Sequence, residues 1–219
     1  MKIKKVAAIF ILGILLVPGF ACNGGPAATP TPTPTPTVVL FSDDFSDESS
    51  GWDTFSDVAG SAAYQDGWLH IRDSTTPEGT TVSRAHRYFT NFIVEVEMKL
   101  VAGTDDNWQS IMFRYVDEEN YYSGEISADG YYEMQLWHQG SLHELVYPTQ
   151  SAYIHQGLGV TNLLRIECVG STFRLSVNGH LLAEVTDATF DGGDICLEVN
   201  SLAGTFSEVA FDNIVVTAP

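Results

Sequence analysis

The sequence predicts an all-β protein, a sandwich of two antiparallel sheets, from two observations. The clearest is a two-residue alternation between positions 92 and 100, a period that no single amphipathic helix would use. Its apolar members predict one buried strand face: Phe92, Val94, Val96, Met98 and Leu100. The other observation is a series of short apolar segments separated by hairpin signals such as Asp66-Gly67 and Asn178-Gly179. No stretch indicates a helix of convincing length.

The segment from Trp108 to His138 predicts three consecutive strands joined by two turns. Strand alternation assigns its side chains to two faces. The apolar face is predicted to hold Ile111, Phe113, Tyr115, Tyr132, Met134 and Leu136. The opposite face is predicted to hold Trp108, Ser110, Met112, Arg114, Tyr131, Glu133, Gln135 and Trp137. Because that face combines aromatic rings with hydrogen-bonding groups, we expect it to bind a flat, polar ligand such as a sugar.

Residues 1–22 predict a bacterial lipoprotein signal peptide. A lysine-rich start precedes an apolar run from Val6 to Val17, which is too short to be read as a spanning helix. The tetrapeptide GFAC that ends at Cys22 is similar to a lipobox, so we expect Cys22 to be lipidated and to tether the chain to the cell membrane. Ordinary signal cleavage and an uncleaved anchor are the alternatives. In each case the domain lies outside the cytoplasm.

Residues 23–38 are of low complexity, and their alternating Thr-Pro pattern favours extended polyproline II geometry. We expect this segment to be a semi-rigid linker. Residues 39–219 then form one domain, long enough to bury a single core.

The charge balance excludes one class of partner. The chain has 10 Lys and Arg against 28 Asp and Glu, and three of these lysines lie in the predicted signal peptide. The mature chain therefore has 7 basic against 28 acidic residues, a net charge of −21. Because such a surface repels phosphate, we expect no nucleic-acid partner.

Three patterns resemble the concanavalin A-like lectin/glucanase superfamily, which includes laminin-G-like and 3-keto-disaccharide hydrolase-like domains. They are IMFRYVDEENYYSGEISADGYYEMQLW, TFRLSVNGHLLAEVTD and GGDICLEVNSLAGTFSEVAFDNIVV. The opening DDFSDESSGW fits the start of such domains, so the resemblance extends over about residues 40–217. It implies an antiparallel jelly-roll sandwich whose concave sheet carries the ligand surface. Since the superfamily holds both binding proteins and glycosidases, the resemblance alone leaves activity open.

The resemblance places the mixed aromatic and polar face on the concave sheet, where Tyr121 and Glu125 join it. The predicted ligand-binding residues are Trp108, Arg114, Tyr121, Glu125, Tyr131, Glu133, Gln135 and Trp137. We expect non-catalytic binding of an oligo- or polysaccharide. Two alternatives stay open: the rings pack beneath a loop, or Arg114 pairs with Glu125 or Glu133 instead of a ligand.

A sugar-processing enzyme and an adhesive, protein-binding module are the competing functions. Superfamily members that cleave β-glucans carry three acids at alternate positions of one strand. The nearest match here is Glu95, Glu97 and then Lys99, in which lysine replaces the last acid. Glu125 and Glu133 are the other candidate acids. A glycosidase needs two carboxyl groups flanking one bond, so this departure disfavours hydrolysis.

The first and last strands of a jelly roll are often neighbours, which brings Asp43, Asp44 and Asp212 toward one seam. Because structural calcium recurs in the superfamily, we expect these oxygens to hold Ca²⁺. Capping of turns by the same carboxylates is the alternative. Cys168 and Cys196 lie on opposite strand faces by parity, which disfavours a disulfide between them.

Overall fold

The computed structural model describes residues 37–74, 79–201 and 205–219. The predicted signal peptide, Cys22 and nearly all of the predicted linker lie outside the described residues. The described part contains strands and turns and no helix, as the sequence predicts. Within these ranges, therefore, no apolar helix reaches the length of a membrane span.

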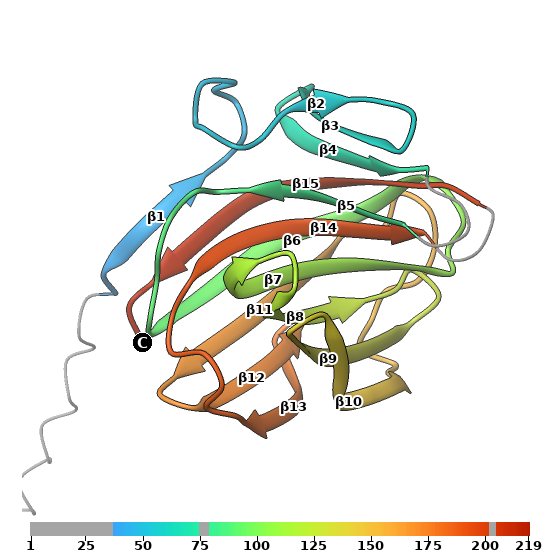
Figure 1. Cartoon of the computed structure of the whole chain (residues 1–219). Helices are drawn as coiled ribbons and strands as arrows, with labels where there is room; N and C mark the ends of the chain where they lie inside the picture. The colour runs from blue at the N-terminus through green and yellow to red at the C-terminus, as the bar shows by residue number, and fades with distance from the viewer. Residues whose placement is uncertain (1–36, 75–78, 202–204) are drawn as a thin grey trace, which may run out of the picture. The chain divides into compact units, whose positions relative to one another are not determined.

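The strands form two antiparallel sheets that lie in two layers (Figure 1). The larger sheet contains β13 (His180–Thr186), β12 (Thr172–Val177), β11 (Asn162–Val169), β6 (Phe92–Gly103), β15 (Ser207–Thr217), β4 (Trp68–Asp73), β3 (Gly60–Gln65) and β2 (Phe55–Ser56), with β1 (Val39–Asp43) also paired to β15. The smaller sheet contains β10 (Ser141–Gln150), β9 (Tyr131–His138), β8 (Asn120–Ile126), β7 (Asn107–Asp117), β14 (Asp194–Ser201) and β5 (Gly79–Arg84). The first and last strands are neighbours, as in a jelly roll (Figure 1).

Apolar side chains from the facing sides of the two sheets form the core. The predicted alternation in β6 is confirmed, because its apolar members are buried while Glu95 and Glu97 face outward. Gly124 in β8 allows close contact between the layers, since a Cβ there would lie 2.5 Å from Ile166 Cδ1 of β11. The six-stranded sheet therefore has one face sealed against the core and one face free for other chemistry.

Two predicted hairpin turns have the backbone conformation that their residues favour. Asp66 and Gly67 have φ angles of 53° and 79°, and Asn178 and Gly179 have φ angles of 51° and 82°. Both pairs thus occupy the left-handed region that a type I′ turn requires. Glycine accepts this region without steric cost, which explains why it stands second in each pair.

One irregularity in β7 reverses part of the predicted pattern. Asp194 and Ile195 are consecutive in β14, yet they pair with Tyr115 and Phe113, so Arg114 is an extra residue in a β-bulge. Arg114 has a φ of 49°, consistent with this break in the ladder. Phe113 and Arg114 therefore both point into the sandwich, and Tyr115 points outward. The predictions that Arg114 faces outward and Tyr115 inward are wrong, because regular alternation does not anticipate an inserted residue.

Candidate functional site

The outer face of the six-stranded sheet, defined by the strand register, carries the candidate site. Its members come from all six strands: Thr80, Val82, Arg84, Trp108, Ser110, Met112, Tyr115, Tyr121, Ser123, Glu125, Tyr131, Glu133, Gln135, Trp137, Leu142, Glu144, Cys196, Glu198 and Asn200. Every predicted ligand residue except Arg114 is among them. Regular pairing between neighbouring strands thus brings together side chains that are far apart in the sequence.

Four glutamates gather on this outer face, and we call them the glutamate cluster. Glu125 of β8 lies opposite Glu133 of β9, while Ser110 of β7 pairs with both Glu125 and Glu198 of β14. Glu144 of β10 lies opposite Gln135 of β9, which is the next residue after Glu133 on the outer face of that strand. The row from Glu198 to Glu133 crosses three strand spacings, or about 14 Å. It is therefore longer than one sugar ring.

Burial changes the protonation of the glutamate cluster. Glu133 is 1% exposed, and Glu125 and Glu198 are each 5% exposed. Desolvation raises the pKa of Glu133 to about 8, with the nearby carboxyls of Glu125 and Glu144 adding to the rise. Desolvation also raises the pKa of Glu125 to about 7, against hydrogen bonding from Ser123. Desolvation also raises the pKa of Glu198 well above its ordinary range, and the charge of Glu125 adds to the rise.

Several oxygen atoms on this face are buried without a hydrogen-bond partner. They are Oγ of Ser110, Oε2 of Glu133, Oε2 of Glu144, Oε2 of Glu198 and Oδ1 of Asn200. The other oxygen of Glu133 accepts from Gln135 Nε2 at 2.8 Å, and Gln135 in turn accepts from Trp137 Nε1 at 3.2 Å. Buried polar atoms are normally satisfied, so an unpartnered set on one face indicates a place where another molecule supplies the partners.

Aromatic rings form a continuous row across the same face. Tyr115 stacks on Tyr121 with ring centroids 5.9 Å apart, and Tyr121 stacks on Trp137 at 6.0 Å. Tyr131 is 36% exposed at the start of β9, and Trp108 is half-buried opposite Asn200. Desolvation, helped by the charges of Glu198 and Glu125, raises the pKa of Tyr121 well above its usual value, so its hydroxyl stays neutral.

A pocket of about 610 Å³ lies over the part of this face nearest β5. It is lined by Asp53, Thr80, Val82, Arg84, Met112, Tyr115, Glu118 and Tyr121. Val82 is the cross-strand neighbour of Glu198, and Thr80 that of Asn200. The pocket therefore runs alongside the glutamate cluster, with the aromatic row as one wall.

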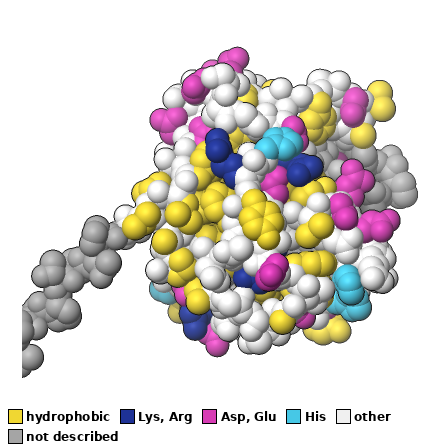
Figure 2. Space-filling model, turned by 60° about the vertical axis from the view of Figure 1, so that its left-hand side comes forward, with side chains coloured by type: hydrophobic (Ala, Val, Ile, Leu, Met, Phe, Trp, Pro, Cys, Tyr) yellow, Lys and Arg dark blue, Asp and Glu magenta, His cyan; other side chains and the backbone are white. Residues whose placement is uncertain are grey.

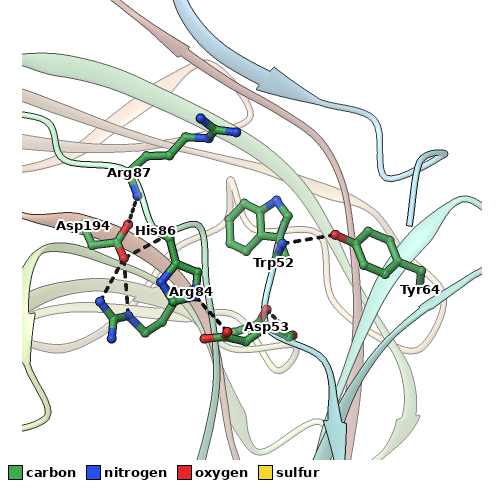
Figure 3. Close-up of polar contacts among 8 residues, drawn as sticks. Trp52, Asp53, Tyr64, Arg84, His86, Arg87 and Asp194 are labelled. Atoms are coloured by element: carbon green, nitrogen blue, oxygen red, sulfur yellow. Dashed lines mark hydrogen bonds and ion pairs between the residues drawn. The ribbon is translucent and has the colours of Figure 1, made fainter. Parts of the chain in front are cut away.

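An ion-pair network fixes one end of this pocket (Figure 3). Asp194 accepts hydrogen bonds from the Arg84 guanidinium at 3.2 Å and from the backbone N–H groups of His86 and Arg87 at 3.1 and 2.8 Å. His86 Nε2 lies 2.8 Å from Asp53 Oδ1. On the face drawn in Figure 2, basic groups, a histidine and acidic groups lie close together beside exposed apolar side chains. Because Arg84 is held by Asp194, its charge is already balanced.

Arg114 lies on the inner side of the sheet and cannot join a site on the outer face. Its Nη1 donates to the Phe190 carbonyl at 2.6 Å, and its Nη2 donates to the carbonyls of Gly170 and Thr90 at 2.6 and 3.1 Å. Its guanidinium also lies 4.8 Å from the centre of the Phe173 ring in the core. Neither predicted role, ligand contact or pairing with a local glutamate, matches this position.

Comparison with known protein families identifies the domain. The model of the 3-keto-alpha-glucoside-1,2-lyase-like domain matches residues 37–217. The chain belongs to this family. The match begins close to the predicted domain boundary and spans both sheets. A search of curated proteins found no significant match.

Solved structures similar to this lyase-like domain share its concanavalin A-like jelly-roll fold. A carbohydrate-binding module, CBM66 from Bacillus subtilis, has 18% identity and a TM-score of 0.62, with 77% of this chain and 96% of that chain covered. A GlcNAcα1-4Gal-releasing endo-β-galactosidase from Clostridium perfringens has 10% identity and a TM-score of 0.64, with 87% and 65% covered. The catalytic domain of a laminarinase from Thermotoga petrophila has 13% identity and a TM-score of 0.57, with 83% and 98% covered. The fold is thus one that carbohydrate-binding and glycoside-active proteins share.

The four acids considered for catalysis lie in two separate pairs in this lyase-like domain. Glu95 and Glu97 belong to β6 of the larger sheet, whereas Glu125 and Glu133 lie on the smaller one. Glu95 forms an ion pair with Arg165 at 2.9 Å. The two pairs of glutamates therefore lie on the outer faces of opposite layers. One glutamate from each pair cannot act on the same glycosidic bond.

The predicted calcium ligands already have protein partners. Asp43 accepts from the Phe45 N–H at 2.8 Å and from Trp52 Nε1 at 3.0 Å, and Asp44 accepts from the Ser46 hydroxyl at 2.6 Å. Asp212 accepts from the N–H of Asn213. Among the described residues, no group of three or more His, Cys, Asp and Glu side chains has the placement of a metal site. Calcium binding at this seam stays a prediction.

Sequence reasoning missed several residues of the candidate site. Glu198 stands in a strand that alternates apolar and polar residues over much of its length, so its parity could have placed it on this face. Glu144 stands in a strand without that alternation, so its position offered no such signal. Arg84 and Tyr115 could not be placed by parity. The role of Arg84 depends on its ion pair with Asp194, and the orientation of Tyr115 depends on the β-bulge at Arg114. Cys168 lies in the core and Cys196 on the outer face, and both are free thiols, consistent with the predicted parity.

Proposed function

We propose that this chain binds a saccharide on the outer face of the six-stranded sheet. The observation that carries the proposal is the set of buried, unpartnered oxygens on Glu133, Glu144, Glu198 and Asn200. Sugar hydroxyls supply hydrogen-bond donors in the number and spread that these acceptors lack. Carbohydrate-binding and glycoside-active proteins with the same fold support this choice of ligand.

The aromatic row provides the apolar half of the interaction. The C–H face of a pyranose ring packs against an aromatic π face, and the partly buried Trp137 ring at the end of the row offers such a surface. The pocket beside Tyr115 and Tyr121 has room for part of an oligosaccharide. In this proposal the aromatic rings supply most of the binding free energy, and the polar groups fix the orientation of the sugar.

Binding without chemistry is the first form of the proposal. The six-stranded sheet does not place three acids along one strand: Glu125, Glu133, Glu144 and Glu198 stand on four different strands. The raised pKa values of Glu133 and Glu198 also keep these two carboxyl groups protonated near neutral pH, so they are suited to hydrogen bonding with hydroxyls.

A second candidate is the activity for which the family is named, and the protonation of two glutamates favours it. A pKa of about 7 for Glu125 and about 8 for its cross-strand neighbour Glu133 lies near the operating pH of a general base and a general acid. In a 1,2-elimination from a 3-keto-glucoside, a carboxylate takes the proton from carbon 2, beside the ketone. The carbon 1–oxygen bond then breaks, a carbon–carbon double bond forms, and the other carboxyl protonates the departing oxygen.

The location of the domain is a further part of the proposal. The GFAC sequence ending at Cys22 supports lipid attachment, and the Thr-Pro spacer supports display away from the membrane surface. We expect labelled fatty acid to be incorporated into the full chain in a bacterial host. Cys22→Ser should abolish the label, and persistence of the label in that variant would contradict lipidation at this residue.

Saccharide binding is tested by screening a glycan panel and then titrating the best ligand by calorimetry. Trp137→Ala should weaken binding about tenfold or more, because one stacking ring is lost. Trp68→Ala is the matched control, since Trp68 belongs to β4 of the larger sheet. Equal losses in the two variants, or no saturable binding to any glycan, would overturn the proposal and leave the adhesive module as the remaining function.

Catalysis is tested with a 3-keto-glucoside as substrate, by following formation of the unsaturated product. If the lyase candidate is correct, Glu133→Gln and Glu125→Gln each remove turnover, whereas Glu97→Gln on the other sheet leaves it intact. Binding without product in the wild-type chain supports the non-catalytic form.

A further inference from the structure

The outer face of the six-stranded sheet lacks a counter-charge for its carboxyl groups. Its described residues include four glutamates and one base, Arg84. Arg84 stands at the far end of β5 and is already paired with Asp194. The glutamate cluster therefore has no arginine, lysine or histidine beside it among the described residues of this face.

The ionisable groups around the cluster make this shortage more severe. Those whose charges act on the cluster or lie within it are Glu125, Glu133, Glu144, Glu198, Asp73 and the neutral hydroxyl of Tyr121. All the charges in this set are negative. Buried carboxylates of like sign cannot all ionise, so at neutral pH protons take the place of the missing cations. Protons held in this way are available for exchange with a ligand that carries its own positive charge.

Building on the proposed saccharide function, we infer that the preferred ligand is an amine-bearing saccharide, such as an oligomer of glucosamine, bound with its ammonium groups against the glutamate cluster. An ammonium group has three donors and no acceptor, which matches the unpartnered oxygens of Glu133, Glu144 and Glu198. The cluster is spread over about 14 Å, so several amines along one chain can each meet a carboxyl group. The aromatic row receives the apolar faces of the same rings.

The same geometry disfavours an acidic saccharide. A uronate would place its carboxylate beside buried carboxyl groups, and Arg84 has no free charge to offer because Asp194 holds it. A neutral saccharide keeps the hydrogen bonds and the stacking, but it leaves the missing counter-charge unfilled. The expected order of affinity is therefore amine-bearing, then neutral, then acidic.

This inference has a signature that stacking alone does not produce. Binding of an ammonium group lets a protonated carboxyl ionise, so binding releases protons to the buffer. Affinity should then rise between pH 5.5 and 7, by up to roughly tenfold per pH unit for each proton released. A neutral saccharide gains nothing from ionisation, and its affinity should stay level or fall over this range.

The test uses the folded chain and three matched oligosaccharides of equal length: glucosamine, glucose and glucuronic acid oligomers. Calorimetric titrations in two buffers of different ionisation enthalpy measure the proton release directly. We expect at least tenfold tighter binding of the glucosamine oligomer than of the glucose oligomer at pH 7, with net proton release. Glu133→Gln and Glu198→Gln should each remove most of this preference, while Glu97→Gln should retain it.

The outcomes separate this inference from the function on which it rests. Glucose oligomers bound as tightly as glucosamine oligomers, without proton release, would overturn the inference and leave saccharide binding in place. Failure of all three oligomers and of the glycan panel would overturn the proposed function itself. Loss of binding in EDTA would also contradict the inference, because it would assign the counter-charge to a metal ion. If the glutamine variants fold poorly, the pH dependence and proton release of the unmodified chain still decide the question.

Discussion

The two faces of the six-stranded sheet hold their buried charged groups in different ways. On the inner face, Arg114 is 2% exposed, and its two terminal nitrogens donate to three backbone carbonyls, although its Nε has no partner. On the outer face, Glu133 is 1% exposed, yet one of its two oxygens has no partner. Both side chains are equally hidden, so burial by itself does not distinguish a structural group from a functional one.

The number of hydrogen bonds made to the fold makes the distinction: the Arg114 guanidinium makes three, and the Glu133 carboxyl makes one. A buried group with many partners in the fold stabilises the fold, and its loss leaves those partners exposed to the apolar interior. A buried carboxyl group with few partners in the fold is a candidate for contact with a bound molecule. The three predictions below test this contrast, from the largest expected effect on stability to the smallest.

The largest effect is expected from Arg114→Met, which should lower the free energy of unfolding by about 3 kcal/mol or more. The change leaves the carbonyls of Phe190, Gly170 and Thr90 without donors and removes a contact with the Phe173 ring. Urea unfolding followed by fluorescence measures it. Arg165→Met is the matched control, because the Arg165 side chain is 33% exposed and its ion pairs with Glu95 and Glu167 contribute less than about 1 kcal/mol. A similar loss of unfolding free energy in both variants would contradict a distinct stabilising role for Arg114 on the inner face.

An intermediate effect is expected in the pH dependence of stability. The folded pKa of Glu133 is about 8 against an ordinary 4.5, so above pH 4.5 the folded chain keeps a proton that the unfolded chain has lost. The contribution of Glu133 is therefore favourable at low pH, is lost as pH rises from about 4.5 to about 8, and is constant above that. Glu133→Gln should flatten the pH profile over this window by on the order of 1–2 kcal/mol.

The measurement for Glu133 is a set of urea unfolding curves at half-unit pH intervals. Glu97→Gln serves as the control, since Glu97 lies on the other sheet and should leave the slope unchanged. An unaltered slope in Glu133→Gln would mean that this carboxyl ionises normally, and the glutamate cluster would lose its unusual chemistry.

The smallest effect comes from two adjacent tyrosines that face opposite ways. The inner Tyr122 hydroxyl donates to Asp187 at 2.5 Å and accepts from the N–H groups of Thr189 and Phe190. Tyr122→Phe should therefore lower the free energy of unfolding by about 1–2 kcal/mol. Tyr121→Phe, on the outer face, should change it by less than about 0.5 kcal/mol. Thermal unfolding of the pair is a direct comparison, and a reversed order would contradict the contrast between the faces.

The sequence predicts the fold well because its signals are local and periodic. The alternation from Phe92 to Leu100 places each of these side chains correctly, since a regular strand has no freedom to do otherwise. The turns at Asp66-Gly67 and Asn178-Gly179 are correct because few residues tolerate a positive φ angle. Strand ends are less predictable: β5 ends at Arg84, because Asp194 binds the backbone N–H groups of His86 and Arg87 that follow it.

The candidate site is predicted in part for the same reason. Parity correctly gives Glu133, Gln135 and Trp137 a common face, to which the family resemblance adds Glu125, and parity extends to Glu198 once the pairing of β14 is known. Parity cannot reveal that Glu133 and Glu198 are buried without partners, because that depends on how six strands and their connections surround them. It also fails at Arg114, where no local pattern announces the inserted residue.

The inserted residue also determines how this domain tolerates change. Phe113 and Tyr115 pair with consecutive residues of β14, so Arg114 sits outside the ladder. Its removal would shorten the strand by one residue and still leave Tyr115 directed at the pocket. The hydrogen bonds of Arg114 inside the sandwich and the placement of Tyr115 at the pocket are therefore separable. Deletion of the single Arg114 codon would remove the hydrogen bonds and keep Tyr115 in place.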